Sequence, residues 1–262
     1  MNIITVDFET FYDRTFSLSK MTTEEYIRHD YFETIGVAVK VNDGETQWFS
    51  GPEVQTKRWL EQFPWDESIA VAHNAMFDMA ILNWHFDIRP KRIADTLSML
   101  RAIDGPDAGN SLAKALERYG LGEKGDEVIH ALGKGRLDFT AEELARYGEY
   151  CINDVEKTYA LFNRIAVGFP AIEFRLIDLT IRMFTEPVLE LDATILKDHL
   201  SEVQRKKNEL LGKALISKDN LMSNGQLADT LRDIGVEPPT KISPATGKET
   251  YAFAKNDEDF KA

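Results

Sequence analysis

Strand-like patterns are concentrated in the first third of this 262-residue chain, and helix-like patterns dominate the rest. The strands are predicted at residues 3–6, 34–41, 46–49 and 68–73. The first three runs follow one another closely, and Asp43-Gly44 between the second and third is typical of a hairpin turn, so an antiparallel set is expected. A sheet followed by helices that cover it predicts an α/β or α+β domain.

Amphipathic patterns bounded by Gly, Pro or capping residues predict the helices. In the first part of the chain they are expected at 53–62, 76–84, 95–103, 111–119, 126–132 and 140–165. The break at Gly168-Phe169-Pro170 ends this part, so a first domain is predicted at residues 1–168. The rest, residues 169–262, is predicted as a helical extension with helices at 173–185, 192–215 and 226–234 and an extended or mobile tail from about 240.

Composition limits the classes of function. No apolar run approaches the roughly 20 residues needed to span a bilayer. We therefore expect an intracellular protein that does not associate with a membrane. The single cysteine, Cys151, has no disulfide partner within the chain, which fits a reducing compartment such as the cytoplasm. The net charge of −13 predicts weak intrinsic affinity for a nucleic acid. Metal ions or a partner protein would then have to keep a nucleic-acid substrate bound to the protein.

Asp7 and Glu9 lie at the end of the first predicted strand. Because side chains alternate along a strand, these two acids share one face while Phe8 turns into the core. Two adjacent carboxylates repel each other unless a cation lies between them, and oxygen ligands suit Mg2+ or Mn2+. A strand end with two solvated acids is the simpler interpretation, so a metal site is favoured only if further carboxylates lie nearby.

Two later segments supply those carboxylates. The run from His73 to Asp78 crosses from a strand into a helix and puts Asp78 in the first helical turn, a position that the helix dipole alone also favours for an acid. In the long helix, Tyr150 and Asp154 are four residues apart and share a face. Tyr147, seven residues before Asp154, lies on nearly the same face and remains a rival for any role of a tyrosine.

In this order, the three segments resemble the DEDD superfamily of 3′-5′ exonucleases. Because it contains a tyrosine, the third segment resembles the corresponding segment of one subgroup. That subgroup contains the proofreading domains of family A DNA polymerases and the ribonuclease D group. The run Asp95-Thr96-Leu97 and the segment 111–121 also resemble this family, and the resemblance covers residues 1 to about 166. It implies a ribonuclease H-like fold, with a central mixed sheet flanked by helices and a C-terminal helical extension.

The resemblance also implies two divalent cations, Mg2+ or Mn2+, bound by four carboxylates. It implies that Asp7 bridges both cations, that Glu9 and Asp154 complete the site of the water-activating one, and that Asp78 supports the second through water. Tyr150 is implied to orient the attacking water. Metal-dependent hydrolysis of a terminal phosphodiester is therefore the predicted chemistry.

Contacts with the single-stranded 3′ end of a substrate are expected next to the carboxylates. Thr10, Phe11, Asn74 and Phe77 are the candidates because they adjoin these acids in sequence. For the aromatic residues, burial in the core is the alternative interpretation.

Residues 223–255 resemble the stretch that enters the polymerase domain of phage-type family A DNA polymerases. This resemblance implies an exonuclease that proofreads DNA for a polymerase, present either as a further domain or as a separate chain. The helices at 173–185 and 192–215 are then predicted to form the joint. An exoribonuclease of the ribonuclease D type and a docking subunit of a split DNA polymerase are the alternatives.

Overall fold

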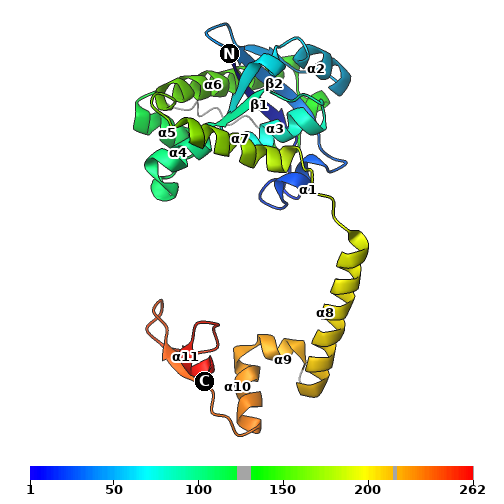
Figure 1. Ribbon diagram of the computed structural model, residues 1–262, viewed down its shortest axis with the longest axis vertical. Helices are drawn as coiled ribbons and strands as arrows, with labels where there is room; N and C mark the ends of the chain where they lie inside the picture. The colour runs from blue at the N-terminus through cyan, green and yellow to red at the C-terminus, as the bar shows by residue number, and fades with distance from the viewer. Residues whose placement is uncertain (123–130, 215–216, 262) are drawn as a thin grey trace. The chain divides into compact units, whose positions relative to one another are not determined.

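A computed structural model describes residues 1–122, 131–214 and 217–261 of the chain. The chain forms two compact units, Met1–Val188 and Leu189–Ala262 (Figure 1). Among the described residues, every helix is too short or too polar to cross a lipid bilayer.

The first unit is built on a five-stranded mixed sheet with the order β3-β2-β1-β4-β5. Its strands are β1 (Asn2–Thr10), β2 (Thr34–Val41), β3 (Gln47–Phe49), β4 (Ser68–Ala72) and β5 (Arg92–Asp95). As predicted, β1, β2 and β3 are antiparallel, whereas β4 runs parallel to β1 and β5 parallel to β4. Strand β5 was not predicted, because four residues directly before a helix give too short a pattern to be recognised.

The helices of the first unit mostly follow the predicted ranges. They are α1 (Thr23–Ile27), α2 (Glu53–Leu60), α3 (Ala75–Trp84), α4 (Thr96–Asp104), α5 (Leu112–Tyr119), α6 (Ala141–Ile165) and α7 (Ala171–Thr185), with 3₁₀ turns at Trp65–Glu67, Pro106–Ala108 and Arg136–Asp138. Helix α1 was not predicted. The helix expected at 126–132 lies mostly outside the described residues, and the two described residues at its end are not helical.

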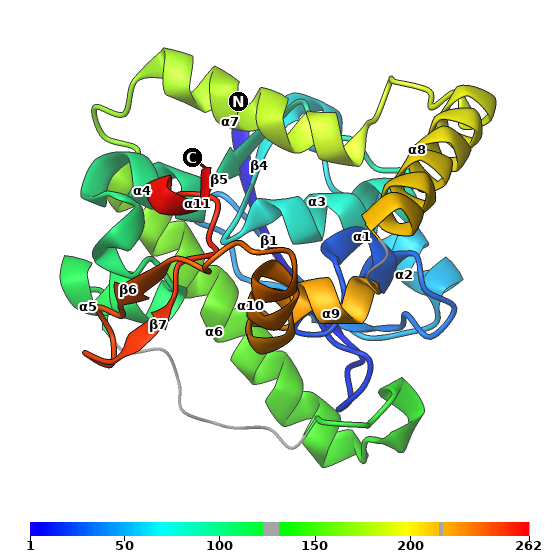
Figure 2. The ribbon, with the colours of Figure 1, turned by 90° about the horizontal axis from the view of Figure 1, so that it is seen from below.

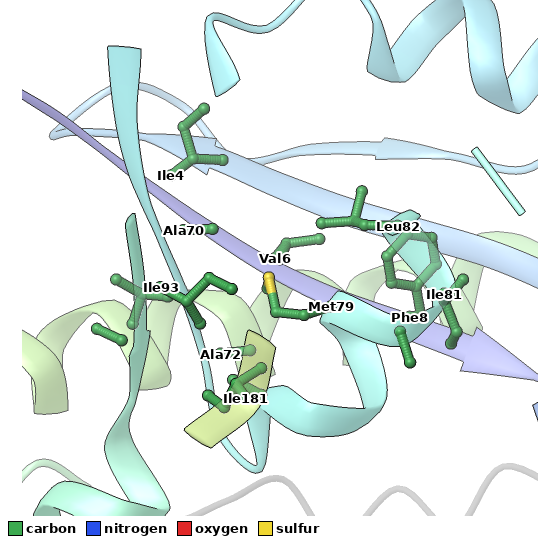
Figure 3. Close-up of a cluster of buried hydrophobic side chains, with 14 of the residues drawn as sticks. Ile4, Val6, Phe8, Ala70, Ala72, Met79, Ile81, Leu82, Ile93 and Ile181 are labelled. Carbon is green, nitrogen blue, oxygen red and sulfur yellow. The ribbon is translucent and has the colours of Figure 1, made fainter. Parts of the chain in front are cut away.

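Helix α6 covers one face of the sheet, and α3 and α7 cover the other (Figure 2). On the face beneath α3, side chains from β1, β4 and β5 meet those of α3 and α7 in the main core (Figure 3). Phe8 belongs to this core and stacks on Phe86 with 5.9 Å between ring centroids. The alternate residues of β1, which include Asp7 and Glu9, therefore lie on the face that α6 covers.

Two glycines let α6 approach the sheet closely at Trp48 of β3. A Cβ atom at Gly36 of β2 would lie 2.2 Å from the indole Cη2, and a Cβ atom at Gly148 of α6 would lie 2.7 Å from the indole Cδ1. The small side chains of Ala38 and Cys151, both fully buried, continue this contact between helix and sheet. The indole ring is therefore enclosed from both sides, and the polar side of α6 is brought close to β1.

Helix α7 packs within the first unit, against α3 and β5. The Trp84 indole N–H donates to the carbonyl of Thr185 at 2.8 Å, and the buried carboxylate of Asp178 accepts from the N–H of Ile93 at 2.8 Å. Because of these contacts the compact unit extends to Val188, beyond the expected domain end at residue 168. A division of function at residue 168 stays a prediction.

The second unit contains the predicted helices and a small amount of further structure. Its elements are α8 (Ala193–Ala214), α9 (Lys218–Met222), α10 (Asn224–Asp233), β6 (Thr240–Ile242), β7 (Glu249–Tyr251) and α11 (Glu258–Lys261). In the tail that was expected to be extended or mobile, β6 and β7 pair as an antiparallel hairpin. Lys241 joins this hairpin to Asp257 through an ion pair of 2.6 Å, a long-range contact that local sequence patterns do not reveal.

Gly148→Ala is expected to lower the free energy of unfolding of the first unit by about 1–3 kcal/mol, the usual cost of overpacking. The added methyl group would press on an indole ring that already lies against Gly36. Urea denaturation followed by circular dichroism measures the loss. Gly212→Ala, at an open position in α8, is the matched control and should leave this unfolding transition unchanged. An unchanged Gly148→Ala protein would contradict the described packing.

Candidate active site

Asp7 and Glu9 form the part of the site that β1 supplies. As the alternation along the strand predicts, both acids are on the α6 side, while Phe8 is only 5% exposed in the opposite core. One carboxylate oxygen of each acid and the Sγ atom of Cys151 all lie within 4.8 Å of one another. The strand end is therefore a gathered group of potential ligands and not a pair of separately solvated acids.

Helix α6 places Cys151 against Asp7. The thiol lies 3.4 Å from the Asp7 carbonyl oxygen and 3.6 Å from Asp7 Oδ2. Burial, then the charges of Asp7 and Glu9, and to a smaller extent that of Asp154, hold the pKa of the Cys151 thiol well above its ordinary value. Cys151 is therefore a neutral hydrogen-bond donor to Asp7. The sequence predicted only a small helix residue here, although its spacing of three from Asp154 places both on one helix face.

Asp78 reaches β1 from the first turn of α3. Strand β4 pairs with β1 only as far as Thr5, and beyond that point the N–H of Phe8 donates to Asp78 Oδ1 at 3.1 Å. The side chain is 3% exposed. Burial and then the negative charge of Asp7 raise the pKa of Asp78 well above its ordinary value, although the Phe8 N–H opposes this shift. Two carboxylates that disfavour each other's charge in the interior are suited to share a cation.

Asp95 holds the turn between β4 and α3. In that turn Asn74 adopts the left-handed conformation, with φ 70° and ψ 49°. Asp95 Oδ1 accepts from the N–H of Asn74 at 2.8 Å and from that of Ala75 at 3.1 Å. The same carboxylate caps α4 by accepting from the N–H groups of Leu97 and Ser98. One buried acid thus fixes the start of α3 and the direction in which this helix presents its first turn. Sequence spacing gave no signal for this long-range role.

The third segment brings two tyrosines and Asp154 to the site. Asp154 is 5% exposed and lies close enough to Cys151 to affect the pKa of the thiol. Tyr150 is half-buried and packs in the same cluster as Tyr147. The hydroxyl of Tyr147, the rival residue, donates to Glu9 Oε2 at 2.7 Å. The four predicted carboxylates therefore come from three elements near the end of β1, and their assignment as metal ligands and the role of Tyr150 stay predictions.

The predicted substrate contacts differ in their accessibility. Asn74 is exposed beside the start of α3. Phe11 and Phe77 are partly buried and pack against the main core. Thr10 is 8% exposed, with its hydroxyl 2.8 Å from that of Tyr26. The burial of Thr10 counts against a direct contact, and all four assignments stay predictions.

A sequence model of 3′-5′ exonucleases matches residues 22–167, which is more than half of the chain. The chain belongs to this 3′-5′ exonuclease family. The matched range contains Asp78, Tyr150 and Asp154, whereas Asp7 and Glu9 lie before it. Divalent metal ions are the cofactors of this family, and the donor chemistry of the site fits them, because the carboxylate oxygens of Asp7 and Glu9 are gathered in one place and the charge of Asp7 acts on Asp78.

Solved structures confirm the predicted ribonuclease H-like fold. RNase D of Trypanosoma brucei in a GMP complex has a TM-score of 0.55 at 16% identity, over 73% of this chain and 61% of that chain. Brucella melitensis NrnC has a TM-score of 0.51 at 12% identity, over 70% of this chain and 81% of that chain. The form of NrnC with bound Mg2+ has a TM-score of 0.50 at 12% identity, with the same coverage of 70% and 81%. No curated protein sequence matches the chain.

Asp78→Asn is expected to make the metal-free protein less sensitive to pH. The raised pKa of Asp78 means that the folded protein binds this proton more tightly than the unfolded chain does, so the contribution of Asp78 to stability falls as pH rises from about 4. The variant keeps an oxygen for the Phe8 N–H but carries no charge. In EDTA at about pH 8 it should therefore be more stable than the wild type, and saturating Mg2+ should remove that advantage.

Urea denaturation in EDTA across this pH range measures the difference between the two proteins. Asp66→Asn, at an exposed position, is the matched control and should follow the wild type. A wild type that gains stability over Asp78→Asn as pH rises would contradict the assigned electrostatics.

Proposed function

We propose that the protein removes nucleoside monophosphates from the 3′ end of single-stranded or frayed DNA, using two divalent cations, Mg2+ or Mn2+. The observation that carries the proposal is the gathering of Asp7 and Glu9 at the end of β1, with Asp78 of α3 near enough for the charge of Asp7 to raise its pKa. Membership of the 3′-5′ exonuclease family supports the reaction and its direction.

The four acids have distinct positions in the proposed site. Asp7 lies near Glu9, and its charge also acts on Asp78, so it would be the ligand that both cations share. Glu9 and Asp154 are assigned to the cation that activates water, and Asp78 to the second cation. When bound, such a pair supplies an activated water and stabilises the charge on the leaving 3′ oxygen.

Tyr150 is assigned to orient the attacking water through its hydroxyl. It lies on α6 one turn before Asp154, and a tyrosine hydroxyl can both donate and accept a hydrogen bond. Asn74, Phe11, Phe77 and Thr10 remain the proposed contacts with the terminal nucleotides, with Asn74 the most accessible of them.

DNA as substrate and proofreading as the biological role rest on the resemblance of residues 223–255 to the entry into a family A polymerase domain. The net charge of −13 opposes tight independent binding to DNA, which suits a nuclease that receives 3′ ends from a polymerase. We assign catalysis to residues 1–168 and the connection to a polymerase to residues 169–262. Likeness to T. brucei RNase D makes an exoribonuclease the second candidate.

A 5′-labelled single-stranded DNA oligonucleotide tests the proposal. With Mg2+ or Mn2+ it is expected to be shortened stepwise from its 3′ end, and faster than the matched RNA. Asp7→Ala and Asp154→Ala should each lower the rate by more than about 100-fold, the upper range for losing a group that only orients a metal ligand. Asp66→Ala, at an exposed site, should retain the activity.

No shortening, or shortening that persists in both site variants, would exclude the assigned site. Preference for RNA would favour the ribonuclease D type of activity. A primer-template with a mispaired 3′ nucleotide adds the test of proofreading, because a frayed end reaches a single-strand site more readily than a paired end. Equal removal of paired and mispaired termini would argue against that role.

A further inference from the structure

The hydrogen bond from Tyr147 to Glu9 joins α6 to the end of β1. The hydroxyl oxygen and Glu9 Oε2 are 2.7 Å apart. Tyr147 is 4% exposed and Glu9 is half-buried, so the bond is partly shielded from water, which strengthens a bond between a hydroxyl and a carboxylate. The assigned catalytic roles leave this tyrosine without a function.

The ring of Tyr147 is held on several sides. It stacks on Phe139 with 5.4 Å between ring centroids and an interplanar angle of 20°, and lies 6.5 Å from the ring of Trp48. Ile35 and Ala131, both nearly fully buried, complete its cluster. Because Gly148 next to it lets α6 contact Trp48, the helix cannot shift without disturbing this packing. The hydroxyl is therefore fixed in place relative to β1.

Glu9 needs such a fixed partner. Its side chain has several rotatable bonds, and it lies beside the carboxylate of Asp7, whose charge repels its own. A carboxylate has about four lone-pair positions, so one hydrogen bond still leaves acceptor capacity for a cation. A tyrosine hydroxyl ordinarily keeps its proton at neutral pH, so that of Tyr147 can donate to this carboxylate.

From this geometry we infer that Tyr147 is a positioning residue, whose hydroxyl holds the Glu9 carboxylate in the orientation that binds a divalent cation. The inference rests on the proposed function, in which Glu9 is a metal ligand. It separates the two tyrosines of α6: Tyr147 acts on metal affinity through Glu9, whereas Tyr150 is assigned to the attacking water. Groups that orient a metal ligand commonly contribute about 10- to 100-fold in affinity.

Tyr147→Phe tests the inference, because phenylalanine keeps the ring and its packing and removes only the hydroxyl. Titration of the protein with Mn2+, followed by the electron paramagnetic resonance of free Mn2+, is expected to show affinity reduced by about 10-fold or more. The Mn2+ concentration for half-maximal cleavage of the DNA oligonucleotide should rise by a similar factor, with the rate at saturating Mn2+ largely kept. Tyr150→Phe should instead lower that saturating rate and leave Mn2+ affinity unchanged.

Tyr159→Phe is the matched control. It lies on the same helix and also donates from its hydroxyl to a carboxylate, that of Asp43 at 2.9 Å, but this hydrogen bond is exposed to solvent. This variant should bind Mn2+ like the wild type. Glu9→Ala completes a double-mutant cycle, in which adding Tyr147→Phe should cause no further loss of Mn2+ affinity, because Tyr147 acts only through Glu9.

The outcomes distinguish this inference from the proposed function. A wild type that binds Mn2+ and shortens DNA, with unchanged or tighter Mn2+ binding in Tyr147→Phe, overturns the inference alone. A further loss of affinity when Tyr147→Phe is added to Glu9→Ala also overturns it, and this comparison holds even if the single variant is less stable. A wild type that neither binds Mn2+ nor shortens DNA overturns the proposed function and the inference with it.

Discussion

Repulsion among carboxylates at the end of β1 is the constraint on which the site depends. After burial, the charge of Asp7 is the largest cause of the raised pKa of Asp78 and of the Cys151 thiol. Three elements that are distant in sequence thus bring negative charge into one part of the interior, and this lowers the stability of the metal-free protein. A divalent cation would convert that cost into binding free energy, which explains why a fold would retain such a cluster.

The scaffold tolerates the cluster because three of the four acids have a donor that fixes them. The Phe8 N–H holds Asp78, Cys151 lies against Asp7, and the Tyr147 hydroxyl holds Glu9. These donors are neutral, so they orient the carboxylates without cancelling the charge that attracts a cation. At the adjoining turn, Asp95 orders the backbone from which α3 begins, in the same way that second-layer groups order metal ligands elsewhere.

Local periodicity predicted much of this arrangement, because alternation along β1 and the four-residue spacing on α6 already define shared faces. It did not reveal that Tyr147 reaches Glu9. That contact depends on how closely α6 approaches the sheet, which Gly36, Gly148 and Trp48 set across the tertiary structure. The bond from Asp95 to the Asn74 turn and the four-residue strand β5 likewise depend on long-range packing.

Acids from β1, α3 and α6 are proposed to bind a pair of divalent cations jointly. Diffraction at the manganese absorption edge from crystals soaked in Mn2+ tests this binding most directly. Two anomalous peaks about 4 Å apart are predicted at the end of β1, with Asp7 beside both and with Glu9, Asp78 and Asp154 around them. Crystals of active protein with no manganese at these residues, or with manganese bound only elsewhere, would contradict the account.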